Sequence, residues 1–550
     1  MFATEYRLFV KRKKLFVMCL LFSSCIILCG IRIAARESYL RIGSLRGTIG
    51  LAKYSFIFFL LLSYLYTNEN FKSGIDEVIA VSDIGKLKAA LYKIMVLQLW
   101  SIALTTGFFM INIVFAPQIN RLIYVWYVVQ LWTLYFLLPN LLASLFGLCL
   151  AGLQNKRAGC LGIILISYIF AGGFPTFLQM TSQKVDVIYK IADLFCIFAR
   201  GTERTPNYYY LIPIEYNNLL RLLLWVIPAG IFLSCIFKTV HAKRWTAALS
   251  GIFIIFFYIY AQPSGSVYFD EHLNGHDEWS ADQYYYHIFR HEGKEEAAKF
   301  QVVDYDINMS VGRQLNAEVT MTPNKTSLSE YVFTLYHGYR VKSVRDSYGN
   351  NLPYDRDGDY IQIINEKGIL DEIHICYAGY SLYFYSTSQG IRLPAYFPYY
   401  PIAGYRKIFD DMDAYGYVRN AADDIAHYHL TLKAPEPVFC SLPQNEDGCY
   451  EGDAEGLTIL GSRFAECFSQ DGLRIVYSEL EYPEEEIQEY HRQLVELGAC
   501  EKPLQVVFLD AYGGYEKYYA DTDQLITLGF TLEEDYTRYL DELKEEKQND

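Results

Sequence analysis

Acidic residues are scarce in the first half of this 550-residue sequence, and basic residues are scarce in the second half. Residues 1–263 hold 25 Lys and Arg against 10 Asp and Glu, whereas residues 264–550 hold 23 against 52. We therefore expect no nucleic-acid partner, because phosphate binding by the second half would need a basic surface. An anionic membrane surface attracts the first half and repels the second, so the two halves are expected in different surroundings.

The first half also contains long apolar stretches in which charged residues are rare. Each stretch is close in length to the roughly 20 residues that a helix needs to cross a bilayer. These stretches predict seven spans, near Leu15–Ala34, Thr48–Tyr66, Lys93–Phe115, Val128–Leu153, Gly159–Met180, Leu219–Phe237 and Ala247–Gln262. The transmembrane domain is thus expected at residues 15–263. Residues 1–14 before it are expected to form a basic interfacial helix, with a plain basic anchor as the alternative.

Clusters of Lys and Arg give the expected orientation in the cell membrane. In a seven-span arrangement the clusters around residues 11–14, 72–88, 156–157 and 238–244 all fall on one side, which the positive-inside rule assigns to the cytoplasm. Four arginines between residues 32 and 46 fall on the other side and weaken this signal without reversing it. We expect a multi-pass protein with a cytoplasmic N-terminus and an extracytoplasmic C-terminal domain.

The loop after the second predicted span contains a short helical stretch made of Gly74, Ile75, Asp76, Glu77, Val78 and Ile79. The basic start, the spans and this loop resemble, over about the first 260 residues, the permease subunits of ABC exporters of the type-2 exporter permease family. The resemblance implies that residues 74–79 couple the chain to a separate ATP-binding subunit, and that a second permease copy or a paralogue completes the path. That family has six spans, and a seventh departs from it.

The chain lacks a phosphate-binding loop of its own. Such a loop needs Gly-x-x-x-x-Gly-Lys-Ser/Thr, and the nearest string, Asp83-Ile84-Gly85-Lys86-Leu87, lacks the first glycine and the hydroxyl. ATP hydrolysis is therefore expected on a separate subunit, and no cofactor is expected on this chain. Within the spans, Lys53 and Arg221 are costly in lipid and are candidates for a transport path; the alternative is that they reach the interface.

Residues 264–300 are predicted to be a linker. His287 and His291 are spaced to share one face of a helix and are weak zinc candidates, beside the simpler interpretation as solvated linker histidines.

From residue 301 apolar and polar residues alternate between turn-forming segments, which predicts a mainly antiparallel β-sandwich or saddle at 301–435 and a smaller β/α region with helical character at 436–550. The order of several segments over about 301–510 resembles the N-terminal β-domain of aminopeptidase N-like zinc metallopeptidases. The segments are Tyr305-Asp306-Ile307, Gly349 and Leu352 before Tyr360-Ile361-Gln362-Ile363, residues 373–379, Tyr396-Phe397-Pro398 and residues 429–435.

The catalytic residues of that family are missing. No His-Glu-x-x-His occurs, and the single His-Glu pair, His291-Glu292, has no partner histidine downstream. A Gly-x-Ser-x-Gly elbow is absent as well. Residues 355–359 alternate carboxylates but lack the glutamate that completes a calcium loop, so a tight turn is expected there. We expect no enzyme activity from this chain.

Among the 12 cysteines, none has zinc-finger spacing. Cys440 and Cys449 flank a turn-rich segment and are candidates for a disulfide.

The sequence thus predicts a permease subunit with a non-catalytic outer β-domain that binds or hands over cargo. Two alternatives remain at this point: a membrane-anchored metallopeptidase relative whose catalytic half is absent or on another chain, and a membrane-anchored receptor or adhesion module.

Overall fold

The computed structural model describes residues 2–37, 43–72, 85–115, 121–174, 194–198, 212, 214, 216–236, 242–262, 285–286, 293–366, 368–381, 384–410, 416–418, 424–499, 504–509, 519–527 and 531–549. The chain divides into two compact units. We call the described residues up to Gln262 the helical unit, and those from Tyr285 onward the β-rich unit.

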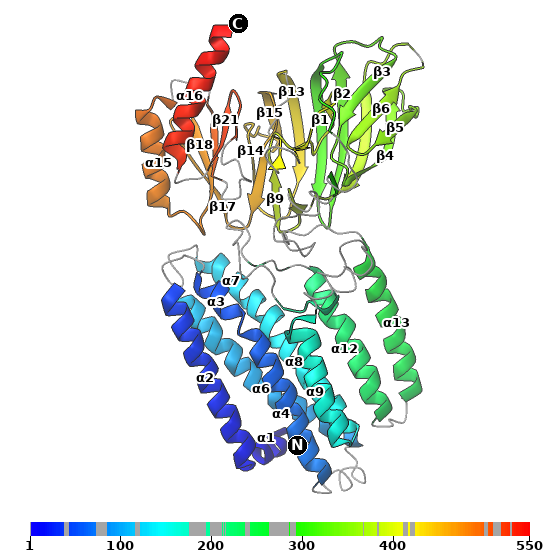
Figure 1. The fold of residues 1–550 in the computed structure, drawn as a ribbon, viewed down its shortest axis with the longest axis vertical. Coiled ribbons are helices and arrows are strands. Elements are labelled where there is room, and N and C mark those ends of the chain that lie inside the picture. Colours follow the sequence, from blue (N-terminus) through cyan, green and yellow to red (C-terminus); the bar gives the residue numbers. More distant parts are fainter. Residues whose placement is uncertain are drawn as a thin grey trace. The chain divides into compact units, whose positions relative to one another are not determined.

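The helical unit is built from apolar helices that run back and forth (Figure 1). They are α1 (Phe2–Lys11), α2 (Lys13–Glu37), α3 (Gly43–Ile49), α4 (Ala52–Lys72), α6 (Gly85–Val114), α7 (Arg121–Trp132), the π-helix η1 (Thr133–Leu137), α8 (Leu138–Gly152), α9 (Lys156–Ala171), α12 (Tyr216–Ile236) and α13 (Ala242–Ala261).

Six helical stretches among the described residues are long and apolar enough to cross a membrane, which makes this a candidate membrane protein. They are Lys13–Arg36, Gly47–Glu69, Lys88–Val114, Leu122–Gly152, Asn217–Ile236 and Lys243–Ala261. The predicted count of seven is not confirmed. The predicted fifth span corresponds to α9, which has 16 described residues, or about 24 Å of helix, and the predicted span continues into residues outside the described ranges.

Close approach between helices holds this unit together. α4 packs against α6, α8 and α9 (Figure 1). A Cβ placed on Gly147 of α8 would lie 2.5 Å from the carbonyl oxygen of Leu60 on α4, so only glycine fits there. A Cβ placed on Gly159 of α9 would likewise lie 2.5 Å from the ring of Tyr64. Small residues at such contacts are typical of helices that pack in lipid, where apolar burial gives no advantage over contact with acyl chains.

Among its described residues, the β-rich unit contains a six-stranded sheet, a five-stranded sheet, two four-stranded sheets and a two-stranded sheet. Its strands are β1 (Val302–Val311), β2 (Leu315–Pro323), β3 (Glu330–Thr334), β4 (Tyr339–Asp346), β5 (Tyr354–Asp357), β6 (Tyr360–Ile364), β7 (Ile373–Gly379), β8 (Ser386–Thr387), β9 (Gly390–Leu393), β10 (Ile402–Ala403), β11 (Phe409–Asp410), β12 (Gly416–Tyr417), β13 (Ala426–Lys433), β14 (Val438–Cys440), β15 (Tyr450–Ala454), β16 (Ile459–Ser462), β17 (Ala465–Gln470), β18 (Leu473–Ser478), β19 (Val506–Leu509), β20 (Tyr519–Ala520) and β21 (Gln524–Thr527). Two helices accompany them, α15 (Glu484–Glu496) and α16 (Leu532–Asn549).

The largest sheet has the order β15-β13-β1-β2-β7-β4, and a second has the order β10-β3-β6-β5. Buried residues of both sheets belong to one hydrophobic core. From Tyr305 onward β1 alternates buried and exposed positions, as period two requires, so one face of the strand joins this core. The pairing is mainly antiparallel, as predicted, but β1 and β13 are parallel, with Asp306 opposite His429. β15 pairs with β13 across residue 435, where the C-terminal region was expected to begin.

The C-terminal part is a mixed sheet, β17-β18-β19-β21-β20, with β18, β19 and β21 parallel. Both faces of β19 are buried: Val506 and Phe508 join the core of the larger sheets, while Val507 and Leu509 pack with residues of α15 and α16. Parallel strands covered on both faces have continuous apolar sequences, which is why this region shows no alternation. The predicted turn at 355–359 is confirmed, since β5 ends at Asp357 and Gly358 has φ +57°.

Candidate functional site

A seam of polar side chains crosses the interior of the helical unit between α4, α6 and α8. Asn140 donates from Nδ2 to Ser101 Oγ at 3.0 Å, and Ser144 Oγ donates to the carbonyl oxygen of Asn140 at 2.8 Å. Ser63 Oγ donates to the carbonyl oxygen of Ser144 at 2.6 Å, and Gln98 Nε2 donates to Ser144 Oγ at 3.3 Å. Ser63, Ser101, Asn140 and Ser144 are all buried.

This seam is positioned by an interruption in the helix that carries it. α7 passes into the π-helix η1, and Pro139 follows at the second position of α8. Proline lacks an N–H group, so it removes the donor that would otherwise pair with the carbonyl of Tyr135. Single-turn π segments inside α-helices occur frequently at functional sites. Asn140 comes directly after the proline, and its Oδ1 has no partner among the described residues.

A second group of polar side chains joins this interruption to α12. Asn218 donates from Nδ2 to the hydroxyl of Tyr135 on η1, and its Oδ1 accepts from Arg221 Nη1 at 2.6 Å. Arg221 also donates to the carbonyl oxygen of Cys196 at 3.1 Å, and it is 5% exposed. Arg221, predicted from the cost of a charge in lipid, is therefore held between elements of the bundle.

Lys53, the other predicted pathway residue, is the second residue of α4 and is half-buried. α4 packs against α6, α8 and α9, whereas α12 packs against α8 and α13. The structure surrounds Arg221 with partners that the sequence did not single out.

A third group fixes α1 to the end of α4. Arg12 donates to the carbonyl oxygen of Tyr66 at 2.9 Å and pairs with Glu69 at 3.2 Å. Tyr66 donates its hydroxyl to Glu5 Oε2 at 2.9 Å, and the buried Phe9 packs edge-on against the Tyr66 ring at 5.2 Å. α1 is a helix that packs against the bundle through Phe9 and Glu5. Whether it lies at the membrane interface stays a prediction.

Three predicted sites lie outside the described residues: the coupling segment Gly74–Ile79 and the histidines His287 and His291. These stay predictions.

The candidate disulfide is absent from the structure. Cys440 and Cys449 are free thiols. Cys440 is buried on β14, in the sheet β14-β16-β9-β8, whereas Cys449 comes just before β15 in the six-stranded sheet, with its Sγ 3.4 Å from Thr431 Oγ1. The turn between them joins two different sheets, so the two thiols belong to separate sheets although they are close in sequence.

The β-rich unit contains a buried carboxyl pair in the turn between β20 and β21. Asp521 and Asp523 are both less than a tenth exposed. Asp521 Oδ1 accepts from the backbone N–H of Gln524 at 3.1 Å, and Oδ2 accepts from Gln524 Nε2 at 2.6 Å. Burial raises the pKa of Asp521 well above its usual range, and the nearby charge of Asp523 raises it further. Burial raises the pKa of Asp523 too.

Another buried acid, Asp359, accepts hydrogen bonds from His337 and Tyr286. Its Oδ1 accepts from the backbone N–H of His337 at 2.6 Å and lies 3.1 Å from His337 Nδ1, and its Oδ2 accepts from the Tyr286 hydroxyl at 3.0 Å. The ring of Tyr285 stacks on His337 with centroids 3.7 Å apart. Tyr285 and Tyr286 belong to the predicted linker, so this contact ties part of the linker to the turn before β6.

Among the residues that the structure describes, no three His, Cys, Asp or Glu side chains are placed to hold a metal ion. The expectation that this chain is not a zinc peptidase stays a prediction.

No known protein family matches the sequence, and no curated protein matches it. Solved structures similar to part of the chain include native yeast LTA4 hydrolase, with 12% identity, a TM-score of 0.30, and 42% of this chain and 41% of that chain covered. The same yeast enzyme in complex with bestatin gives 14% identity, a TM-score of 0.31, and 44% and 43% coverage. An M1 zinc metallopeptidase from Deinococcus radiodurans gives 15% identity, a TM-score of 0.29, and 43% and 61% coverage.

The chain therefore spans roughly two fifths to three fifths of the length of these proteins.

Proposed function

We propose that this chain is a permease subunit of an ABC-type exporter, and that its β-rich unit is a non-catalytic module that binds or hands over cargo. The observation that carries the proposal is the buried polar seam of α4, α6 and α8, with its extension through Tyr135 to Arg221 on α12. A receptor or adhesion module needs one span for anchoring. A bundle with an interrupted helix and buried polar groups supports a role within the membrane instead.

The contacts of α9 support an odd number of crossings. Only residues 153–155 separate α8 from α9, and the side chain of Asn155 caps α9 by accepting from the backbone N–H groups of Arg157 and Ala158. α9 then packs back along α4 and α8, with Gly162 against Leu150. The predicted fifth span extends beyond α9 to Met180. If α9 and the rest of this span cross the membrane together, the bundle has seven crossings.

The basic residues support the proposed orientation. Lys13 and Lys14 begin α2, Lys156 and Arg157 begin α9, and Lys243 and Arg244 lie in the first turn of α13. In a seven-crossing bundle these three starts share one side, which the positive-inside rule assigns to the cytoplasm. The acidic β-rich unit then lies outside the cell membrane.

In this proposal ATP is hydrolysed by a separate ATP-binding subunit, and a second permease copy or a paralogue lines the rest of the path. The contact with the ATP-binding subunit is assigned to residues 74–79. Arg12, Tyr66 and Glu69 connect α1 to the end of α4 that precedes this loop, so a movement of the loop would reach α1 and α4 together.

The test is purification of the full chain in mild detergent from its native host. We expect an ATP-binding subunit to co-purify, and we expect the Asp76→Lys/Glu77→Lys variant to lose it. The matched control is Asp83→Lys, which reverses an acid elsewhere in the same loop and should keep the partner. Purification without any ATP-binding subunit would refute the proposal.

The same preparation tests the alternative of a metallopeptidase relative. One zinc ion per chain, with chelator-sensitive hydrolysis of aminoacyl substrates, would favour that alternative. Protease treatment of intact cells tests the orientation: we expect the β-rich unit to be cleaved.

A further inference from the structure

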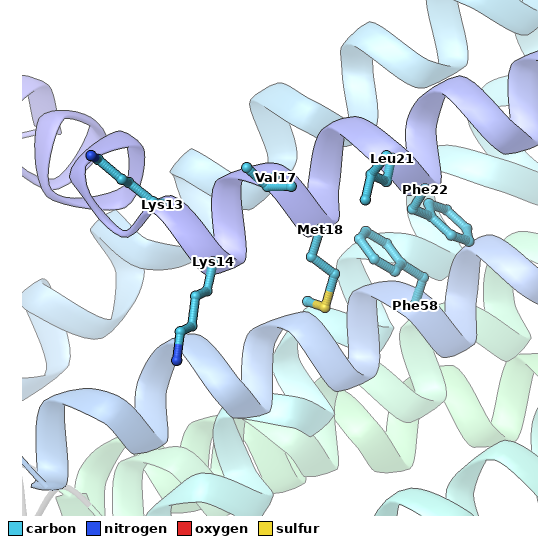
Figure 2. Close-up of a pocket in the computed structure, with 7 residues that line it drawn as sticks. All are labelled: Lys13, Lys14, Val17, Met18, Leu21, Phe22 and Phe58. Atoms are coloured by element: carbon cyan, nitrogen blue, oxygen red, sulfur yellow. The ribbon is translucent and has the colours of Figure 1, made fainter.

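A groove runs along the helical unit between α2 and the middle of α4. Its volume is about 650 Å³, and it is open to the surroundings of the bundle. Figure 2 shows the side chains that line it: Lys13, Lys14, Val17, Met18, Leu21 and Phe22 from α2, and Phe58 from α4.

The chemistry of the groove changes from one end to the other. Lys14 and Met18 point from α2 toward α4, whereas Phe22 and Phe58 meet at the far end (Figure 2). These two rings stack with centroids 3.8 Å apart and an interplanar angle of 3°, which closes that end. Val17 and Leu21 are 48% and 67% exposed, so they present apolar surface along the side. Both lysines are exposed.

The length of the groove matches one leaflet of a bilayer. From Lys13 to Phe22 the helix rises about 14 Å at 1.5 Å per residue. One leaflet contributes about half of the 30 Å hydrocarbon core. α2 is itself among the helices that are long and apolar enough to cross a membrane. The two lysines therefore lie where lipid headgroups begin, and the stacked rings lie near the middle of the bilayer.

Charge decides between the possible occupants. An acyl chain alone would explain the apolar part. The exposed Lys14, whose side chain points across the mouth, and the neighbouring exposed Lys13 add positive charge there, which complements a negatively charged phosphate.

We propose that this groove binds an anionic phospholipid, with one acyl chain along Val17, Met18 and Leu21 and the phosphate beside Lys13 and Lys14. The lipid fills the gap between α2 and α4 and supports the contact that Phe22 makes with Phe58. This proposal depends on a membrane location but not on transport or on an ATP-binding partner.

The test is native mass spectrometry of the delipidated full chain, titrated with phosphatidylglycerol or with phosphatidylcholine of the same acyl chains. We expect one phosphatidylglycerol to bind more tightly than the others. In the Lys13→Gln/Lys14→Gln variant its affinity should fall about 25-fold, at about 5-fold for each lysine near a phosphate, while phosphatidylcholine binding stays unchanged.

The matched control is Lys243→Gln/Arg244→Gln, which removes two exposed charges from α13 and should leave the tight site intact. A second variant, Met18→Trp, fills the groove and should weaken both lipids without changing the charge. The proposal would be overturned if the control lost as much affinity for phosphatidylglycerol as Lys13→Gln/Lys14→Gln does, or if Met18→Trp bound both lipids as the wild type does. So would a change from dimer to monomer in Met18→Trp with lipid binding retained, since a second copy would then be the occupant.

Discussion

The helical unit and the β-rich unit bury polar groups in different ways. The helical unit buries small hydroxyls and amides that bond to a neighbouring helix, such as Ser63 and Asn140, together with the charged Arg221. The β-rich unit buries many tyrosines whose hydroxyls donate to backbone carbonyls, such as Tyr377 to Tyr399 at 2.7 Å and Tyr399 to Leu457 at 2.8 Å.

This difference follows from what each unit gains by burial. Within lipid, apolar area drives little association, so close contact and short hydrogen bonds hold helices together. In water, burial of a large aromatic side chain is strongly favourable, and the hydroxyl only has to find an acceptor. We therefore expect added volume to be most costly in the helical unit and lost volume to be most costly in the β-rich unit. The cost of a lost hydrogen-bond partner should depend on whether the group left behind is charged.

The largest effect is expected from Gly147→Leu. The new Cβ would meet the backbone of Leu60 and Tyr64 on α4, and backbone cannot move aside as a side chain can. We expect a loss of about 3 kcal/mol or more in the free energy of unfolding, seen as a lower unfolding temperature in detergent. The control Gly251→Leu adds the same side chain on α13, where nothing lies within 4 Å. Equal effects of the two substitutions would contradict the close-packing account.

The second-largest effect is expected when Arg221, in the helical unit, loses its hydrogen-bond partner Asn218. Asn218→Leu removes the acceptor that lies 2.6 Å from Arg221 Nη1 and the donor to Tyr135. A hydrogen bond to a buried charge contributes about 2–3 kcal/mol, so we expect a loss of that size in unfolding free energy. The double variant Asn218→Leu/Arg221→Leu should recover part of the loss, because it removes the buried charge as well. A double variant with the summed cost of both single changes would argue against coupling.

How far the sequence predicts this molecule differs between the units. The long apolar stretches locate α2, α6, α12 and α13, because length and hydropathy alone define a candidate span. Alternation locates β1, β2 and β7. The parallel pairing of β1 with β13 could not be predicted, since local alternation carries no information about a partner more than a hundred residues away.

The site was predictable only in part. Arg221 stands out in sequence as a charge within an apolar stretch. Asn218 and Tyr135 do not, because an amide near a helix end and a tyrosine within an apolar helix are both common. The carboxyl pair Asp521 and Asp523 was missed, since Asp-x-Asp between two strands is typical of an exposed turn. The apolar strands on both sides of that turn are the one signal that could have indicated burial.

Lost partners in the β-rich unit are tested by Tyr399→Phe, with a smaller expected effect. The substitution keeps the ring but leaves the carbonyl of Leu457 without the tyrosine donor. We expect a loss of about 1–2 kcal/mol, measured by denaturant unfolding of the full chain in detergent and followed by near-ultraviolet circular dichroism. Tyr348→Phe, at a tyrosine that is 85% exposed, should have no effect. A cost for Tyr348→Phe as large as that for Tyr399→Phe would contradict this account.

The smallest effect is expected in the pH dependence of folding stability, which the carboxyl pair Asp521 and Asp523 should influence. Burial raises the pKa of Asp521 and Asp523 in the folded state, while the unfolded chain releases these protons at about pH 4. Above that pH the unfolded state holds fewer protons, so stability falls as pH rises toward the folded-state pKa values.

Asp523→Asn removes one of the two acids and also the charge that raises the pKa of Asp521. We therefore expect the unfolding temperature of the β-rich unit to fall less steeply between about pH 4.5 and 8. Asp447→Asn makes the same chemical change in an exposed turn and should keep the wild-type slope. An unchanged slope in Asp523→Asn would mean that the pair is already ionised in the folded protein. The β-rich unit would then bury two negative charges, whereas the polar seam between α4, α6 and α8 buries only neutral hydroxyl and amide groups.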